Sequence, residues 1–203
     1  MDNSGARRII PIILILIVIA VAIAAVVSIG QNIFGGNTTE EVNQGQRSLL
    51  DTSESRTVRM TVRGPIIANE QFTTYSITVK PGSRNMTTYL GYLSKQVETV
   101  ERDNNIPAYE QLVYALDRSK MMDASEPEGE KNDTRGICAT GRMFTFETLN
   151  NSTVIKSLWT TTCNDSRGTL STNFVPLQNL FLRQIPTSSE LINRVTAAAQ
   201  KAK

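Results

Sequence analysis

The feature that most constrains this chain is an unbroken apolar segment near its N-terminus. Residues 9–29, IIPIILILIVIAVAIAAVVSI, contain no charged side chain. As a helix that rises about 1.5 Å per residue, the segment would be about 31 Å long, which is close to the thickness of the hydrocarbon core of a bilayer. The sequence therefore predicts a single transmembrane helix, with the lipid bilayer as its partner.

The charges on either side of this segment predict its orientation. Arg7 and Arg8 precede it, whereas the first charges after it are Glu40 and Glu41. Basic residues favour the cytoplasmic side of a membrane. Residues 1–8 are therefore expected to be a cytoplasmic tail, and the rest of the chain is expected to lie outside the cytoplasmic membrane.

A cleaved signal peptide is the competing interpretation of the same segment. Ala22-Ile23-Ala24 resembles a cleavage site with small residues. A cleavable signal usually has a shorter apolar region that turns polar near the cut, whereas here Val26 and Ile29 prolong the run. The sequence favours an uncleaved anchor.

The composition changes beyond the apolar segment. Residues 30–55 are rich in Gly, Asn, Gln, Ser and Thr, so they are expected to form a linker. Residues 56–203 are numerous enough for one hydrophobic core and are expected to form one extracytoplasmic domain. The formal net charge of the whole chain is only +2, which implies no nucleic-acid partner.

Apolar periodicity predicts an α+β fold for the outer domain. Alternation of apolar and polar residues over 56–63 and 72–79 is typical of two paired strands. Apolar residues over 90–100 recur at helical spacing, and a second helix is expected to begin near Asn105. Its apolar face would carry Tyr109, Leu112, Val113 and Leu116.

The end of the chain predicts three further elements. A strand is expected over 169–175 and a helical turn over 177–183. Thr187 and Glu190 have the spacing of a capping box, which predicts a final helix. With a cysteine-bearing hairpin before them, the expected order is ββααββ and a C-terminal helix around an antiparallel sheet.

The hairpin is predicted from TLNNSTV at 148–154, which lies midway between the chain's two cysteines. Asparagine tolerates the left-handed backbone of a tight turn, so Asn150 and Asn151 are expected to form a two-residue turn. In that register the numbers of paired residues sum to 301, which places Cys138 opposite Cys163. Opposed cysteines have the separation that a disulfide needs.

Other states of the two cysteines remain open from the sequence. They could be unpaired buried thiols, or they could bind metal or act as nucleophiles. Metal binding by two isolated cysteines would need further ligands, and the chain contains no histidine to serve as a ligand or as a base. We therefore expect a structural disulfide in an oxidising compartment, with no metal site and no cofactor site.

The sequence also bears on catalysis. The chain contains no histidine. This excludes catalytic mechanisms that depend on imidazole, whether the nucleophile is a serine, a cysteine or a metal-bound water. The chain has no S-x-x-K motif and no glycine-rich phosphate loop. We therefore predict a noncatalytic surface protein without catalytic residues. Two alternatives stay open, namely a carboxylate-based hydrolase of envelope polymers and a subunit of a pilus-like filament.

Four segments carry a resemblance to a known group of proteins. They are VRMTVRGPIIANEQFTTYSITV, MTTYLGYL, NNIPAYEQLVYALDRSKMM and LFLRQIP. These segments resemble uncharacterised single-span envelope proteins of Saccharibacteria-type bacteria, which live attached to host bacteria. The resemblance implies a protein of the cell envelope and, as partner, an envelope or host-surface protein or polymer. It implies no functional residues.

Overall fold

The computed structural model describes residues 43–126, 129–165 and 168–201 of the chain. The predicted cytoplasmic tail, the predicted membrane span and the first part of the predicted linker lie outside the described residues. Within the described ranges, no helix has both the length and the apolarity to cross a bilayer. From Asn43 onward the chain forms one compact unit.

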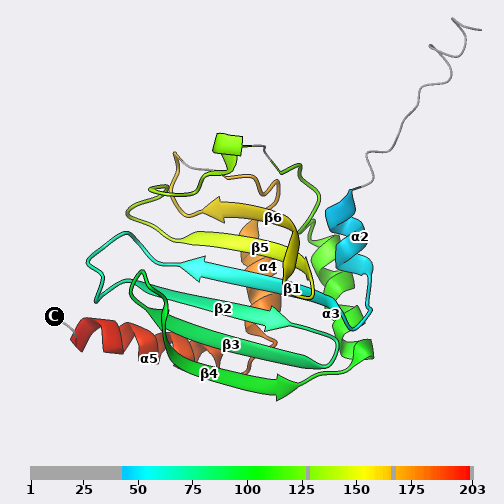
Figure 1. The fold of residues 1–203 in the computed structure, drawn as a ribbon, viewed down its shortest axis with the longest axis horizontal. Coiled ribbons are helices and arrows are strands. Elements are labelled where there is room, and N and C mark those ends of the chain that lie inside the picture. Colours follow the sequence, from blue (N-terminus) through cyan, green and yellow to red (C-terminus); the bar gives the residue numbers. More distant parts are fainter. Residues whose placement is uncertain (1–42, 127–128, 166–167, 202–203) are drawn as a thin grey trace, which may run out of the picture. The chain divides into compact units, whose positions relative to one another are not determined.

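An antiparallel sheet of six strands dominates this unit (Figure 1). The strand order is β4-β3-β2-β1-β5-β6, so the first strand lies inside the sheet and pairs with both β2 and β5. The strands are β1 (Arg56–Arg63), β2 (Thr73–Val79), β3 (Ser83–Leu90), β4 (Lys95–Asp103), β5 (Met143–Asn150) and β6 (Thr153–Thr161).

Helices complete the unit, and the predicted α+β class is confirmed. Figure 1 shows α4 and α5 behind the sheet, on one of its faces, and α2 beside α3 at one end of the strands. The α-helices in the described ranges are α2 (Gln44–Leu50), α3 (Ile106–Arg118), α4 (Phe174–Leu182) and α5 (Ser188–Lys201), with a short 3₁₀ helix, η1 (Gly129–Asn132).

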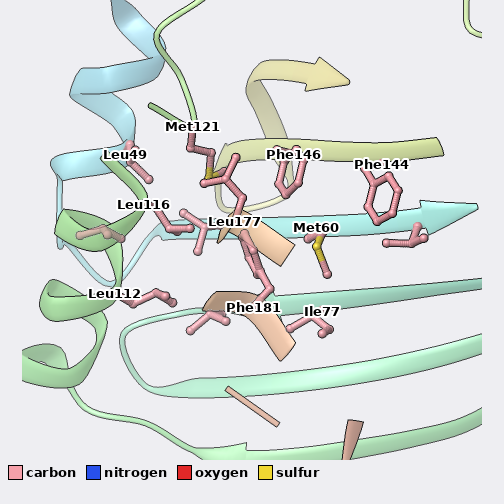
Figure 2. Packing of buried hydrophobic residues seen from close by; sticks show 14 of the residues in the cluster. Leu49, Met60, Ile77, Leu112, Leu116, Met121, Phe144, Phe146, Leu177 and Phe181 are labelled. Atoms are coloured by element: carbon pink, nitrogen blue, oxygen red, sulfur yellow. The ribbon is translucent and has the colours of Figure 1, made fainter. Parts of the chain in front are cut away.

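The core lies between the helices and the inward face of the sheet. Because side chains alternate along a strand, Met60 of β1, Ile77 of β2 and Phe146 of β5 share one face, and all are fully buried. Figure 2 shows Leu177 and Phe181 of α4 among these side chains. The centroids of the Phe146 and Phe181 rings are 6.1 Å apart.

The apolar face predicted for the helix after Asn105 is confirmed. Its residues Tyr109, Leu112, Val113 and Leu116 are all buried in α3.

The folded unit begins earlier than the sequence predicted. Residues 44–50 were expected to belong to a linker, but they form α2, whose Leu49 is fully buried. The Asn43 side chain caps this helix, because its Oδ1 accepts a hydrogen bond from the backbone N–H of Gln46 at 3.2 Å. Lys156 Nζ of β6 donates to the same Oδ1 at 2.8 Å and so ties α2 to the sheet.

The helix predicted over 90–100 is wrong. Leu90 is the last residue of β3, residues 91–94 form the turn, and residues 95–100 belong to β4. The four strands β1 to β4 follow one another as a meander. Gly91 and Ser94 have positive φ angles of 77° and 54°, which a helix does not allow. Leu93 at the tip of the turn is 96% exposed. The apolar residues with helical spacing belong to β3, to the turn and to β4, so their spacing does not come from one helix.

The predictions for the elements after the hairpin are confirmed in part. The predicted helical turn over 177–183 corresponds to the second part of α4 and its C-cap, Arg183, and the predicted final helix is α5. The strand predicted over 169–175 is wrong, since this segment leads into α4. Its first residues nevertheless lie along the outer edge of β6, because the backbone N–H groups of Thr169 and Leu170 donate to the carbonyl oxygen of Trp159.

The predicted turn of the cysteine hairpin is shifted by one residue. Asn150 is the last residue of β5 and pairs with Thr153, so Asn151 and Ser152 form the turn. A register shift between Thr148 and Leu149 moves the pairing further along the hairpin. The predicted sum of 301 is therefore wrong. Asn151 does adopt the left-handed conformation, with a φ of 53°.

Candidate functional site

One face of the sheet carries no α-helix in the described part of the chain. Figure 1 shows this face in front of α4 and α5. Its side chains are the polar residues that alternate with the core positions, and cross-strand pairing arranges them in rows. The central row crosses all six strands as Trp159, Thr145, Thr61, Ser76, Thr87 and Thr99.

A second row of the same face contains its central ion pair. Arg59 Nε donates to Glu147 Oε2 at 2.7 Å, and the two side chains are 34% and 12% exposed. The two charges offset each other, so the middle of the face is electrostatically neutral. The row consists of Ser157, Glu147, Arg59, Thr78, Asn85 and Glu101. Strands lie about 4.8 Å apart, so each row is about 24 Å wide.

Hydroxyl groups give this face its chemistry. Thr87 Oγ1 and Thr99 Oγ1 are 2.9 Å apart and share a hydrogen bond between β3 and β4. Each hydroxyl can also accept or donate a further hydrogen bond. We call this surface, made of the two rows described above, the open face. It offers many donors and acceptors of hydrogen bonds and no excess of positive charge, because Glu147 offsets Arg59 and Glu101 is the one further charged residue of the two rows.

A loop covers the β6 end of the open face. The indole of Trp159 is only 7% exposed, because η1 lies against it and Asn132 Oδ1 accepts a hydrogen bond from Trp159 Nε1 at 3.2 Å. Glu126 Oε1 accepts from Asn132 Nδ2, and Glu126 Oε2 accepts from the backbone N–H of Ser157. Arg63 holds the following part of the loop, since its Nη2 donates to the carbonyl oxygen of Ile137 at 3.0 Å.

The predicted disulfide is present at the end of the same hairpin. Cys138 and Cys163 are bonded with an S–S distance of 2.07 Å and a Cα separation of 5.5 Å. They meet for a different reason from the one predicted. Both lie outside β5 and β6, and a turn in which Cys138 has a φ of 53° brings it back toward Cys163. Gly141 packs against both sulfurs, because an added Cβ would lie 2.6 and 2.9 Å from them.

Two carboxyl groups of the described domain have perturbed pKa values. The backbone N–H of Ser53, and then Arg56, lower the pKa of Asp51. Hydrogen bonds from Arg135 lower the pKa of Asp133 to about 2. Both groups are held in the ionised form, whereas a general acid needs a raised pKa. The described residues contain no group of three or more metal-binding side chains.

Comparison with known proteins adds no further assignment. No protein-family model and no curated protein sequence matches the chain. The candidate site therefore rests on the geometry of the open face. Its signal was already in the sequence, since the strict alternation over 56–63 places Arg59 and Thr61 on the side away from the core. The partners of Arg59 and Thr61 on other strands could not be read from that alternation.

Proposed function

We propose that the chain is a noncatalytic module of a bacterial cell envelope. Residues 9–29 anchor it in the cytoplasmic membrane, with the N-terminus inside and the folded domain outside. The domain binds or scaffolds an envelope or host-surface component through the open face. The observation that carries this proposal is the set of hydroxyl side chains in the central row, which lie on five adjacent strands, from β5 to β4, on the face away from the α-helices.

The chemistry of the open face favours an extended, polar polymer without an excess of negative charge. A stable protein interface usually has an apolar centre, whereas Thr61 and Ser76 lie at the centre of this face. Nucleic acids and anionic lipids require an excess of positive charge, but Glu147 offsets Arg59. The hydroxyl groups of a polysaccharide can donate to and accept from a row of threonine and serine side chains.

Sedimentation with insoluble peptidoglycan sacculi tests the proposal. The detergent-solubilised full chain is expected to sediment with the sacculi. Ser76→Arg, which places a long charged side chain at the centre of the open face, is expected to weaken binding about tenfold, or 1.4 kcal/mol. Asn193→Arg is the matched control, because it makes the same change of charge at an exposed position of α5.

Two outcomes would contradict the proposal. If Asn193→Arg weakened sedimentation as much as Ser76→Arg, the effect would be one of charge and not of the open face. If the wild-type chain stayed in solution with sacculi and with whole envelope fractions, the open face would not be a polymer-binding surface.

The hydrolase alternative makes a different prediction for the same assay. Glycosidases need two carboxyl groups about 5 to 9.5 Å apart. Glu147 and Glu101 share a row of the open face, but four strand spacings, or about 19 Å, separate them. Release of soluble fragments from the sacculi by the wild-type chain, but not by Glu147→Gln, would favour the hydrolase.

A further inference from the structure

A cavity lies at the end of the sheet where β1 ends and β5 begins. Its volume is about 450 Å³, and it is lined by the β1–β2 loop, the start of β2, the start of β5 and the last turns of α5. This volume is within the range of small-molecule sites, about 300 to 1,000 Å³. The lining residues used below are Pro65, Ile67, Gln71, Arg142, Ala199 and Gln200.

The backbone of Arg142 is held firmly at this cavity. Its N–H donates to Thr162 Oγ1 at 2.9 Å, and its carbonyl oxygen accepts from the N–H of Thr162 at 3.0 Å. Thr162 precedes Cys163, and Gly141 packs against the disulfide immediately before Arg142. The disulfide therefore fixes the backbone from which the Arg142 side chain projects.

The side chain of Arg142 has unused binding capacity. Its guanidinium forms no hydrogen bond and no ion pair with any residue that the structure describes, and neither does the side-chain amide of Gln71 or Gln200. No acidic residue is found among the described residues that line the cavity. A guanidinium at a cavity without an acidic partner is complementary to an anion, and its planar fork matches a carboxylate with two hydrogen bonds.

The rest of the lining selects the kind of anion. Pro65, Ile67 and Ala199 are apolar, so this part of the cavity is complementary to an apolar group and not to a second charge. We infer that this cavity binds a small carboxylate that carries an apolar group, such as the C-terminal residue of a peptide. Arg142 would bind the carboxylate, the two glutamines would donate amide N–H groups, and the apolar residues would contact the side chain of the ligand.

Binding of N-acetylalanine to the full chain in detergent micelles tests this inference, with N-acetylalaninamide as the neutral probe of the same shape. Calorimetry is expected to show that the acid binds at least about tenfold more tightly than the amide. Arg142→Gln should abolish this preference. Arg102→Gln, which removes an exposed arginine of β4, is the control and should leave it unchanged. Reduction of the disulfide should weaken binding of the acid.

Several results would overturn the inference. Equal binding of the acid and the amide would exclude a carboxylate site, as would an acid affinity that survives Arg142→Gln. Absence of saturable binding of the acid would exclude the site altogether. Binding of inorganic phosphate with the same dependence on Arg142, and as tightly as the acid, would contradict the selectivity for an apolar carboxylate. None of these results depends on sedimentation with sacculi, so failure here and failure of the proposed function are distinguishable.

Discussion

Removing the disulfide should destabilise the domain by an amount that follows from the loop it closes. Cys138 and Cys163 are 25 residues apart. In the chain-entropy model, a crosslink of this span stabilises the folded state by about 3.5 kcal/mol, because it restricts the unfolded chain. In a domain of this size, each kcal/mol shifts the thermal midpoint by about 2 to 4 °C. The double variant Cys138→Ala/Cys163→Ala should therefore unfold about 7 to 14 °C lower.

Circular dichroism of the full chain in mild detergent measures this shift. The wild-type chain with and without a phosphine reductant is the necessary comparison, because reduction opens the crosslink without changing any side chain volume. Both experiments should give the same shift. If neither lowers the midpoint by more than about 2 °C, the β5–β6 hairpin already closes this loop in the unfolded chain, and the entropic argument is refuted.

Three further predictions concern other parts of the domain. Gly141→Ala would place a Cβ 2.6 and 2.9 Å from the two sulfurs of the disulfide, so thiol titration should find more free cysteine than in Gly82→Ala, where the added Cβ meets nothing within 4 Å. Leu49→Ala removes a fully buried side chain of α2, and urea unfolding should show that the free energy of unfolding falls by about 2 to 5 kcal/mol. A negligible decrease would mean that residues 44–50 behave as part of the linker. The pKa of Asp51 is lowered by the N–H of Ser53, so its contribution to stability is present above its ordinary pKa of 3.8 and is lost as the pH falls through the lowered value. Urea unfolding of the wild-type chain should therefore lose more free energy than that of Asp51→Asn when the pH is lowered through this window.

The sequence predicted the elements whose signals are local. β1 and β2 follow from alternation over 56–63 and 72–79, and α3 follows from an N-cap at Asn105 before an apolar face. The error over 90–100 has a physical cause. Leu93 and Val97 are exposed, at a turn and on an edge strand, so two of the apolar residues that made the helical spacing are not core positions at all.

Features that depend on contacts between residues far apart in the sequence could not be predicted from the sequence. The disulfide was predicted from a register that is shifted in the structure, and the pair forms because Cys138 adopts a left-handed turn outside the strand. Helix α2, which carries the buried Leu49, packs against α3, β5 and β6, and these elements begin between about 60 and 110 residues after Leu49. The open face required the strand order, since Thr61 and Thr145 become neighbours only when β5 pairs with β1.

The two borders of the sheet differ, and this difference limits how copies of the domain can join. In the part of the chain that the structure describes, the border at β6 is bonded at Trp159 by the backbone N–H groups of Thr169 and Leu170, and at Ser157 by the carboxylate of Glu126, whereas β4 pairs with β3 alone. Exposed strand borders are the usual route to edge-to-edge aggregation. The freer border for a second copy that extended this sheet is β4, and a contact of β4 with β4 uses this border in both copies. Growth through β4 alone would therefore stop at a dimer, and a filament of this protein would need contacts other than pairing of β4 strands.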